Sequence, residues 1–362
     1  MGKNMTCSRN TTGRAALHAV AAAAAITLGA AQFAAAAVFS EVEPNDNKAT
    51  ANPVGPMLAG DSITGNTTGS STTVAGPASA DNFLISFPVA APAIYRNRLV
   101  ITSNTPAHTG TIRGLNQTAA PVDTLPGRPW DGVVGTPTAG TDAAIQTSST
   151  ATTPARFNQF YTFGAPTQMV YRVTGVATST ADYTATLETQ TVTPTNIGTY
   201  VPGEITISTF NQGHTTDTDM WVYDSNFNAI RGYGNDDESV AGGTPGTGAS
   251  LQSWLARNYA PGTYYLSLSN FSTANDQPAP SDDDFRTGTL MDFPGVIANS
   301  STTAALNMTF TITDSAGTTL QVANTKAGAF DINFFQFTVV PEPTTLGLLA
   351  AGLPLLFRRR RA

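Results

Sequence analysis

Short runs in which apolar and polar residues alternate recur along the chain between Val38 and Val340. A period of two gives a strand one apolar face, whereas an amphipathic helix repeats every three to four residues. Gly, Pro, Asn, Asp and Ser separate the runs, as is typical of turns between strands. The clearest predicted strands, rich in residues that favour strands, are 83–87, 99–102, 169–173, 183–187, 264–268, 306–312 and a closing pair at 319–322 and 334–339.

The strand pattern is interrupted near residues 191–196, where Thr, Pro and Asn gather. The stretches on either side have loosely similar strand orders, and each is about 150 residues long, a normal domain size. We therefore predict two all-β units, at 38–192 and 193–338, each a sandwich or a barrel. One larger sandwich that spans both stretches is the alternative. The stretch 115–153 is expected to be an insertion without strands.

The first 37 residues have the features of a secretory signal peptide. Three basic residues (Lys3, Arg9 and Arg14) precede an apolar stretch that ends in small residues at 34–37. Cleavage after Ala37 would start the mature protein at Val38. An uncleaved membrane anchor is the alternative, because about 20 apolar residues can span a bilayer.

Residues 339–362 form a tail with three parts. A Pro-Glu-Pro motif is followed by an apolar segment at 344–357 and then by four arginines. As a helix, the apolar segment would be about 21 Å long, shorter than the roughly 30 Å hydrocarbon core of a bilayer. We expect a short hydrophobic helix that is held only transiently in the inner membrane. The arginines would stay on the cytoplasmic side, with the rest of the chain outside.

This tail resembles the PEP-CTERM sorting signal of Gram-negative bacteria. The resemblance implies that a membrane exosortase recognises the motif and removes the tail after signal peptidase has acted at the other end. It also implies delivery to the cell surface or the extracellular matrix. An ordinary tail anchor is the alternative. The residues that carry the resemblance are Pro341, Glu342, Pro343, Arg358, Arg359, Arg360 and Arg361.

Three further segments resemble the bacterial pre-peptidase C-terminal domain. Residues 41–51 look like its Glu-Pro-Asn-Asp opening, 217–226 like its Asp-x-Asp strand segment, and 260–265 like its Ala-Gly-Thr-Tyr-Tyr strand. The second unit lacks its own Glu-Pro-Asn-Asp opening. The resemblance implies secreted, non-catalytic domains. The predicted fold is thus all-β, with two jelly-roll-like β-sandwich units flanked by the signal peptide and the short hydrophobic helix.

Composition excludes several classes of protein. Only 12% of the residues are charged, about half the share usual in soluble proteins. One Cys and three His rule out a disulfide scaffold and a zinc finger, and the chain has no basic face for nucleic acid. Without its two ends the body keeps 11 basic residues against 25 acidic ones, counting Glu342, so that its net charge is −14 rather than −7.

Acidic residues gather near the ends of one predicted strand in the second unit. Asp217 and Asp219 lie at its start, and Asp236 and Asp237 lie in the next Gly-rich loop. Calcium takes six to eight oxygen ligands, usually from loops, so these four residues are the predicted calcium ligands. The spacing matches no EF-hand loop. Solvated turns are the alternative, because Asp and Asn are common turn formers.

No catalytic residue is predicted. The chain has neither a Gly-x-Ser-x-Gly elbow in its body nor a phosphate-binding loop, and we expect His108 and His214 to be exposed loop residues. Trp130 is the candidate for stacking on a sugar, whereas Trp221 is expected to pack inside. The expected function is that of a structural or adhesive protein. The alternatives are a carbohydrate-binding module acting on exopolysaccharide and a secreted hydrolase with paired carboxylates.

Overall fold

The structure is a computed structural model of the chain, and the all-β prediction is confirmed for the residues that it describes. The single helical element among them is a 3-10 turn, η1 (Lys48–Thr50), whose first backbone N–H groups bond to the Asn47 side chain. No helix in the described part of the chain is long and apolar enough to cross a membrane. The described residues are 35–68, 79–103, 108–116, 141–150, 156–175, 180–237, 250–277 and 289–341.

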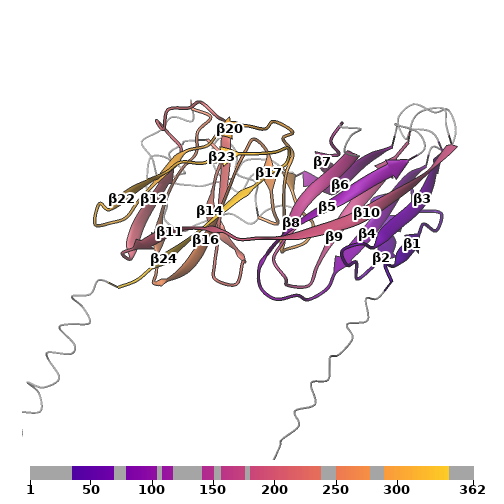
Figure 1. The fold of residues 1–362 in the computed structure, drawn as a ribbon, viewed down its shortest axis with the longest axis horizontal. Coiled ribbons are helices and arrows are strands. Elements are labelled where there is room, and N and C mark those ends of the chain that lie inside the picture. The colour runs from indigo at the N-terminus through magenta and orange to yellow at the C-terminus, as the bar shows by residue number, and fades with distance from the viewer. Residues whose placement is uncertain are drawn as a thin grey trace, which may run out of the picture. The chain divides into compact units, whose positions relative to one another are not determined.

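The first sandwich contains one sheet with seven described strands (Figure 1). The long strand β10 pairs antiparallel with β3 on one side and with β5 on the other. The spatial order is β1 (Val38–Ser40), β3 (Ser62–Thr68), β10 (Thr180–Val192), β5 (Ile94–Ser103), β8 (Arg156–Thr162), β19 (Val296–Asn299) and β17 (Thr273–Ala274).

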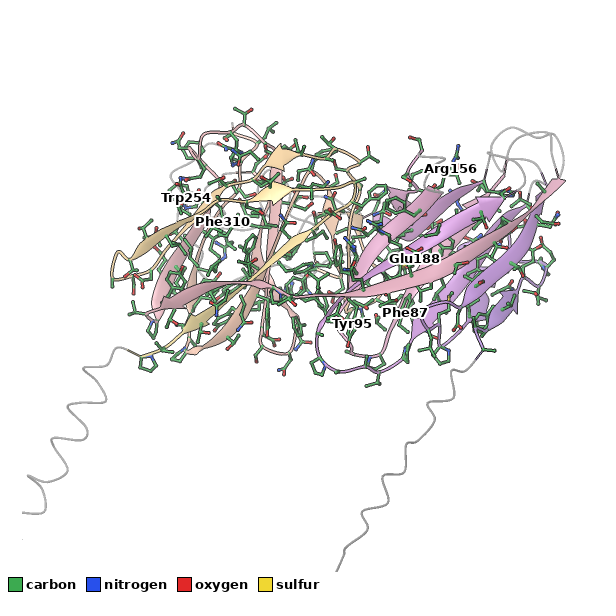
Figure 2. All side chains as sticks on the ribbon, in the orientation of Figure 1. Phe87, Tyr95, Arg156, Glu188, Trp254 and Phe310 are labelled. Carbon is green, nitrogen blue, oxygen red and sulfur yellow. The ribbon has the colours of Figure 1, made fainter. Side chains whose placement is uncertain are left out.

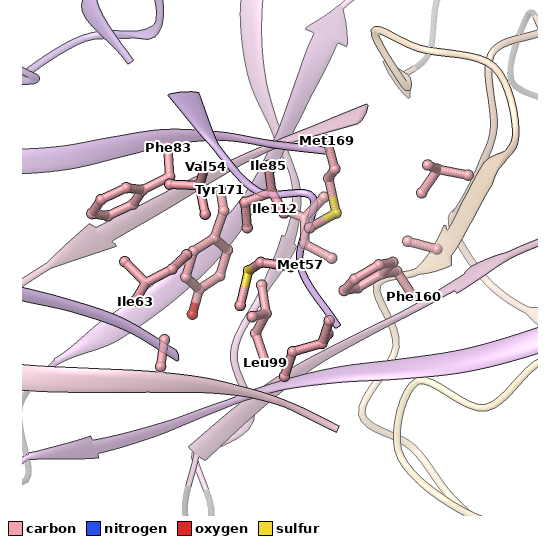
Figure 3. Close-up of a cluster of buried hydrophobic side chains, with 14 of the residues drawn as sticks. Val54, Met57, Ile63, Phe83, Ile85, Leu99, Ile112, Phe160, Met169 and Tyr171 are labelled. Atoms are coloured by element: carbon pink, nitrogen blue, oxygen red, sulfur yellow. The ribbon is translucent and has the colours of Figure 1, made fainter. Parts of the chain in front are cut away.

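A second sheet, with six described strands, faces the first one. The core between them holds Ile63 and Leu99 from the seven-stranded sheet against Phe83, Ile112 and Tyr171 from the six-stranded sheet (Figure 3). The spatial order is β18 (Thr289–Leu290), β6 (Thr109–Asn116), β9 (Thr167–Thr174), β4 (Ala80–Phe87) and β2 (Asn52–Val54), with β7 (Thr141–Thr147) also paired to β6.

The second sandwich is built from a five-stranded and a four-stranded sheet among the described residues. Leu266 and Phe337 from the larger sheet pack with Ile207 and Phe310 from the smaller one. Trp254 and Phe310 mark the smaller sheet in Figure 2. The larger sheet has the order β11 (Thr195–Tyr200), β24 (Asn333–Val339), β16 (Gly262–Asn270), β13 (Thr218–Tyr223) and β14 (Ala229–Asn235); the smaller has β15 (Trp254–Tyr259), β12 (Gly203–Ser208), β21 (Phe310–Thr313) and β22 (Thr319–Val322).

The second half of the chain supplies strands to the first sandwich. Residues 273–299 are here called the exchanged segment, and β17, β18 and β19 the exchanged strands. After β16 the chain leaves the second sandwich, and its next strands extend both sheets of the first one: β18 pairs with β6, and β19 pairs with β8. It then returns through β20 (Leu306–Asn307), which pairs with β23 (Thr325–Lys326). The ranges predicted as separate units, 38–192 and 193–338, therefore both contribute strands to the first sandwich.

A third hydrophobic cluster, here called the seam, lies between the sandwiches. Phe163 comes from the first sandwich, Tyr223 and Phe334 from the second, and Ile297 from the exchanged strand β19. Trp221 is buried here, as predicted. In β16, Leu266 and Leu268 face the core, as the alternation in 264–268 predicts; Tyr265 and Ser267, which the same alternation places on the outer face, are covered, since Tyr265 packs against the seam and Ser267 is buried.

Three predictions about strands are wrong. The predicted closing pair does not form, since β22 pairs with β21 and β24 pairs with β16 and β11. The predicted strand 306–312 is broken, because Asn307 Oδ1 accepts a hydrogen bond from Thr309 N in a local turn. The stretch 115–153 contains β7, whose alanines are weak strand formers but which is held by pairing with β6.

Candidate metal centre

Three aspartates of the second sandwich converge at the start of β13. Met220 on β13 lies opposite Asn235 on β14, so the ladder places Asp219 opposite Asp236, the residue after β14. Asp217 precedes Asp219 by two residues, and side chains two apart on a strand point to the same face. The carboxylate oxygens of Asp217, Asp219 and Asp236 accordingly lie within 4.8 Å of one another.

Asp219 is the most buried of the three, with 1% of its surface exposed. Its Oδ2 accepts a hydrogen bond from Thr273 N, on the exchanged segment. Its Oδ1 is buried and finds no donor among the described residues, and the same holds for Asp236 Oδ1. Buried carboxylate oxygens without donors are costly, so this arrangement needs a cation or a proton.

The same geometry raises the pKa values of Asp219 and Asp236. Burial raises the pKa of Asp219, although its hydrogen bonds oppose the rise. Burial is also the main cause for Asp236, and the neighbouring charge of Asp219 adds to it, so that the pKa of Asp236 rises to about 12. Without a cation the pair therefore holds a proton at neutral pH. Cation binding must displace that proton.

The structure brings together three of the four predicted ligands. Asp217, Asp219 and Asp236 meet, as described above, whereas Asp237 is buried beside them but is not part of the cluster. Its negative charge still contributes to the raised pKa of Asp236. Thr273 could not be predicted, because nothing in the local sequence pattern indicates that its segment lies beside Asp219.

The donor set determines which cations suit the site. Three carboxylates are hard oxygen ligands, which favour calcium, magnesium or manganese over softer metals. Each carboxylate can bind calcium through one or two oxygens. Main-chain carbonyls and water would complete the six to eight ligands that calcium takes. The unpaired, buried Oδ1 of Asp219 is the feature that fits a resident cation.

A second buried carboxyl group lies in the first sandwich. Both carboxyl oxygens of Asp81 and Oε2 of Glu41 are buried without a donor among the described residues. They lie close to Tyr183; a side chain at Gly65 would come within 2.3 Å of Glu41 Oε2 and the Tyr183 hydroxyl. Burial is the main cause that raises the pKa of Asp81 to about 8. A proton shared with Glu41 and the negative charges of Glu41 and Glu43 add to the rise.

The prediction that both histidines are exposed is wrong. His108 is 2% exposed and lies 2.7 Å from the hydroxyl groups of both Thr67 and Ser103. His214 is half-buried, with Nε2 2.9 Å from the Thr309 carbonyl oxygen. Thr67 and Ser103 lie near the ends of β3 and β5, and Thr309 lies between β20 and β21. Burial lowers the pKa of His108.

Other predicted functional residues fall outside the described part of the chain. These are Trp130, Glu342, Pro343 and the four arginines 358–361, together with the predicted hydrophobic helix and the signal peptide up to residue 34. Pro341 is described and is exposed just after β24.

Comparisons with known proteins add no further constraint. No protein-family model matches the chain. No curated protein matches it either. The role of the aspartates is therefore interpreted from their geometry alone.

Proposed function

We propose that this chain is an exported, non-enzymatic β-sandwich protein of the bacterial cell surface or extracellular matrix, stabilised by calcium at Asp217, Asp219 and Asp236. The observation that carries the calcium assignment is the buried Oδ1 of Asp219, which finds no donor among the described residues, in a carboxylate grouped with those of Asp217 and Asp236. Aspartates that merely form solvated turns would keep their oxygens in water. A divalent cation would instead offset the burial of these charges.

Three features of the sequence support export. The signal-like N-terminus, the Pro-Glu-Pro tail and the basic end occur together. The body between them has no cysteine and is strongly acidic. A protein outside the cell also meets the higher calcium concentrations that weak extracellular sites require.

The position of the site indicates what the ion does. Asp219 lies on β13, Asp236 directly follows the neighbouring strand β14, and Asp219 also accepts a hydrogen bond from Thr273 N on the exchanged segment. A bound ion would thus hold three segments together at one point. Its role would be to stabilise the fold that presents the surface of the protein.

Calcium is expected to raise the melting temperature of the mature protein. A ligand present at 100 times its Kd stabilises the folded state by about 2.7 kcal/mol, which corresponds to a shift of about 4 °C for a chain of about 300 residues. The shift is measured by thermal unfolding with calcium and with EDTA. Asp219→Asn should lose most of it, because the variant keeps the shape of the side chain but removes the charge.

The matched control is Glu204→Gln, which removes an exposed carboxylate from the same sandwich. This variant should keep the full calcium shift. Identical melting curves in calcium and EDTA for the wild type would contradict a stabilising calcium site.

The exported protein is expected to lack both ends. Intact-mass measurement of material from the cell surface or the medium should show the loss of residues 1–37 and of Arg358–Arg361. Replacing Glu342 by alanine in the motif should leave the tail in place. A wild-type protein that reaches the surface with its arginines intact would contradict the proposed sorting.

A further inference from the structure

A cleft with a volume of 250 Å³ lies where the two sandwiches meet. The first sandwich contributes Phe163 and Pro166, from the connection between β8 and β9. The second contributes the turn between β13 and β14, and the exchanged segment contributes residues on either side of β18. The volume is close to the lower end of the range for small-ligand sites, about 300–1,000 Å³.

The polar side chains that line this cleft are four amides, one carboxylate and the Tyr223 phenol. The amides and the carboxylate belong to Asn226, Asn228, Asn275, Asp276 and Gln277, and no Lys, Arg or His is among the described residues that line it. An anionic ligand would therefore find no positive partner among these described residues. Hydroxyl groups both donate and accept hydrogen bonds, so they match a surface of amide and carboxylate groups.

One wall of the cleft is held rigidly. Phe227 has a φ of 62° and is stacked between Phe163, at a ring-centroid distance of 5.3 Å, and Tyr265, at 4.3 Å. Asp224 Oδ1 accepts hydrogen bonds from the main-chain N–H groups of Asn226 and Asn228. These contacts fix the turn before any ligand arrives, which lowers the entropic cost of binding.

Asn226 at this turn has its side chain available. The residue is exposed, and its amide group makes no hydrogen bond with any described residue. The rigid turn thus presents the unused amide donor and acceptor of Asn226 at the edge of the cleft.

The opposite wall is ordered by its own hydrogen bonds. Asn275 Nδ2 donates to the Tyr223 hydroxyl over 3.1 Å, and its Oδ1 accepts from Gln277 N over 2.9 Å. Gln277 Nε2 donates to Asp276 Oδ2 over 3.2 Å. The partly buried carboxylate of Asp276 is thereby oriented by its neighbour.

We infer that this cleft binds a neutral saccharide unit, with Asn226 and Asp276 contacting its hydroxyl groups. Phe163 and Phe227 supply the apolar part of the wall. None of the three aspartates of the metal centre lines the cleft, and the proposed binding needs no cation.

The test begins with the wild-type mature protein on an array of neutral oligosaccharides of glucose, galactose, mannose and N-acetylglucosamine. The best array ligand is then titrated by calorimetry in EDTA. Asn226→Ala and Asp276→Asn should each weaken binding about tenfold or more. The control is Ser225→Ala, which alters an exposed residue of the same turn that does not line the cleft and should leave affinity unchanged.

Asn226→Ala removes an exposed side chain, so its melting temperature should match that of the wild type and loss of binding cannot be assigned to unfolding. The inference is overturned if no neutral oligosaccharide binds. It is also overturned if both cleft variants keep wild-type affinity, or if Trp130→Ala alone abolishes binding.

Discussion

The Phe163→Ala variant is expected to lower the free energy of unfolding by about 3–5 kcal/mol, the usual cost of truncating a buried phenylalanine. Phe163 belongs to the first sandwich, but its ring contacts Tyr223 and Phe227 of the second at centroid distances of 5.0 and 5.3 Å. It also meets the edge of the Phe334 ring. The loss should therefore destabilise both sandwiches together.

Two optical signals separate joint from independent unfolding. In a Trp130→Phe background the remaining tryptophans, Trp221 and Trp254, lie in the second sandwich, so their fluorescence reports on that part, whereas far-UV circular dichroism reports on strands of both. Adding Phe163→Ala in this background should shift the two signals together, by about 5–8 °C. Phe271→Ala is the control, because Phe271 is 56% exposed and should change stability by no more than about 0.5 kcal/mol. An unchanged fluorescence transition in Phe163→Ala would contradict the seam as a shared core.

Replacing Asp81 by asparagine is expected to stabilise the protein at pH 8 by about 3 kcal/mol. The pKa of Asp81 is raised in the folded state to about 8, so the folded protein binds this proton more tightly than the unfolded chain. The stabilisation that the folded protein gains from the Asp81 proton is therefore fully present below about pH 4 and is lost as the pH rises to 8. The shift of about four units sets an upper bound of about 6 kcal/mol, and sharing of the proton with Glu41 reduces it.

The measurement is urea unfolding at several pH values between 4 and 8, in EDTA so that protons alone neutralise the site. The wild type should lose stability across this range, and Asp81→Asn should lose much less. Glu188→Gln is the matched control, since Glu188 is an exposed carboxylate of the same sandwich (Figure 2). Parallel pH profiles for the wild type and Asp81→Asn would show that ionisation of Asp81 does not destabilise the protein.

Much of the strand pattern could be predicted because it is local. The alternation in 169–173 and 264–268 identifies β9 and β16, since every second residue of these strands enters a core. The exchanged strands could not be predicted in the same way. β17 and β18 are two residues long, and a pair of residues carries no period. The partners of β18 and β19, which are β6 and β8, are also more than 100 positions away in the sequence.

The metal centre was partly predictable for a related reason. Asp217 and Asp219 are two positions apart on one strand, so their shared face follows from the strand period. The position of Asp236 opposite Asp219 depends on the register of the hairpin, which shifts between Trp221 and Tyr223 and does not follow from the connection at 224–228. Residues 80–87 loosely resemble the Asp-aromatic strand of the pre-peptidase C-terminal domain, but the burial of Asp81 could not be predicted, because an aspartate at the start of a strand usually indicates an exposed turn.

The strand exchange also determines when the first sandwich can be completed. Its seven-stranded sheet includes β19, which ends at Asn299, although its own last long strand ends at Val192. A fragment that stops at residue 192 would leave the edges of β6 and β8 without these partners, and open edges invite aggregation. For a chain that crosses a membrane from its N-terminus, the same dependence postpones final folding until most of the chain has emerged. If the chain is exported as proposed, the first sandwich can be completed only after residue 299 has crossed the membrane.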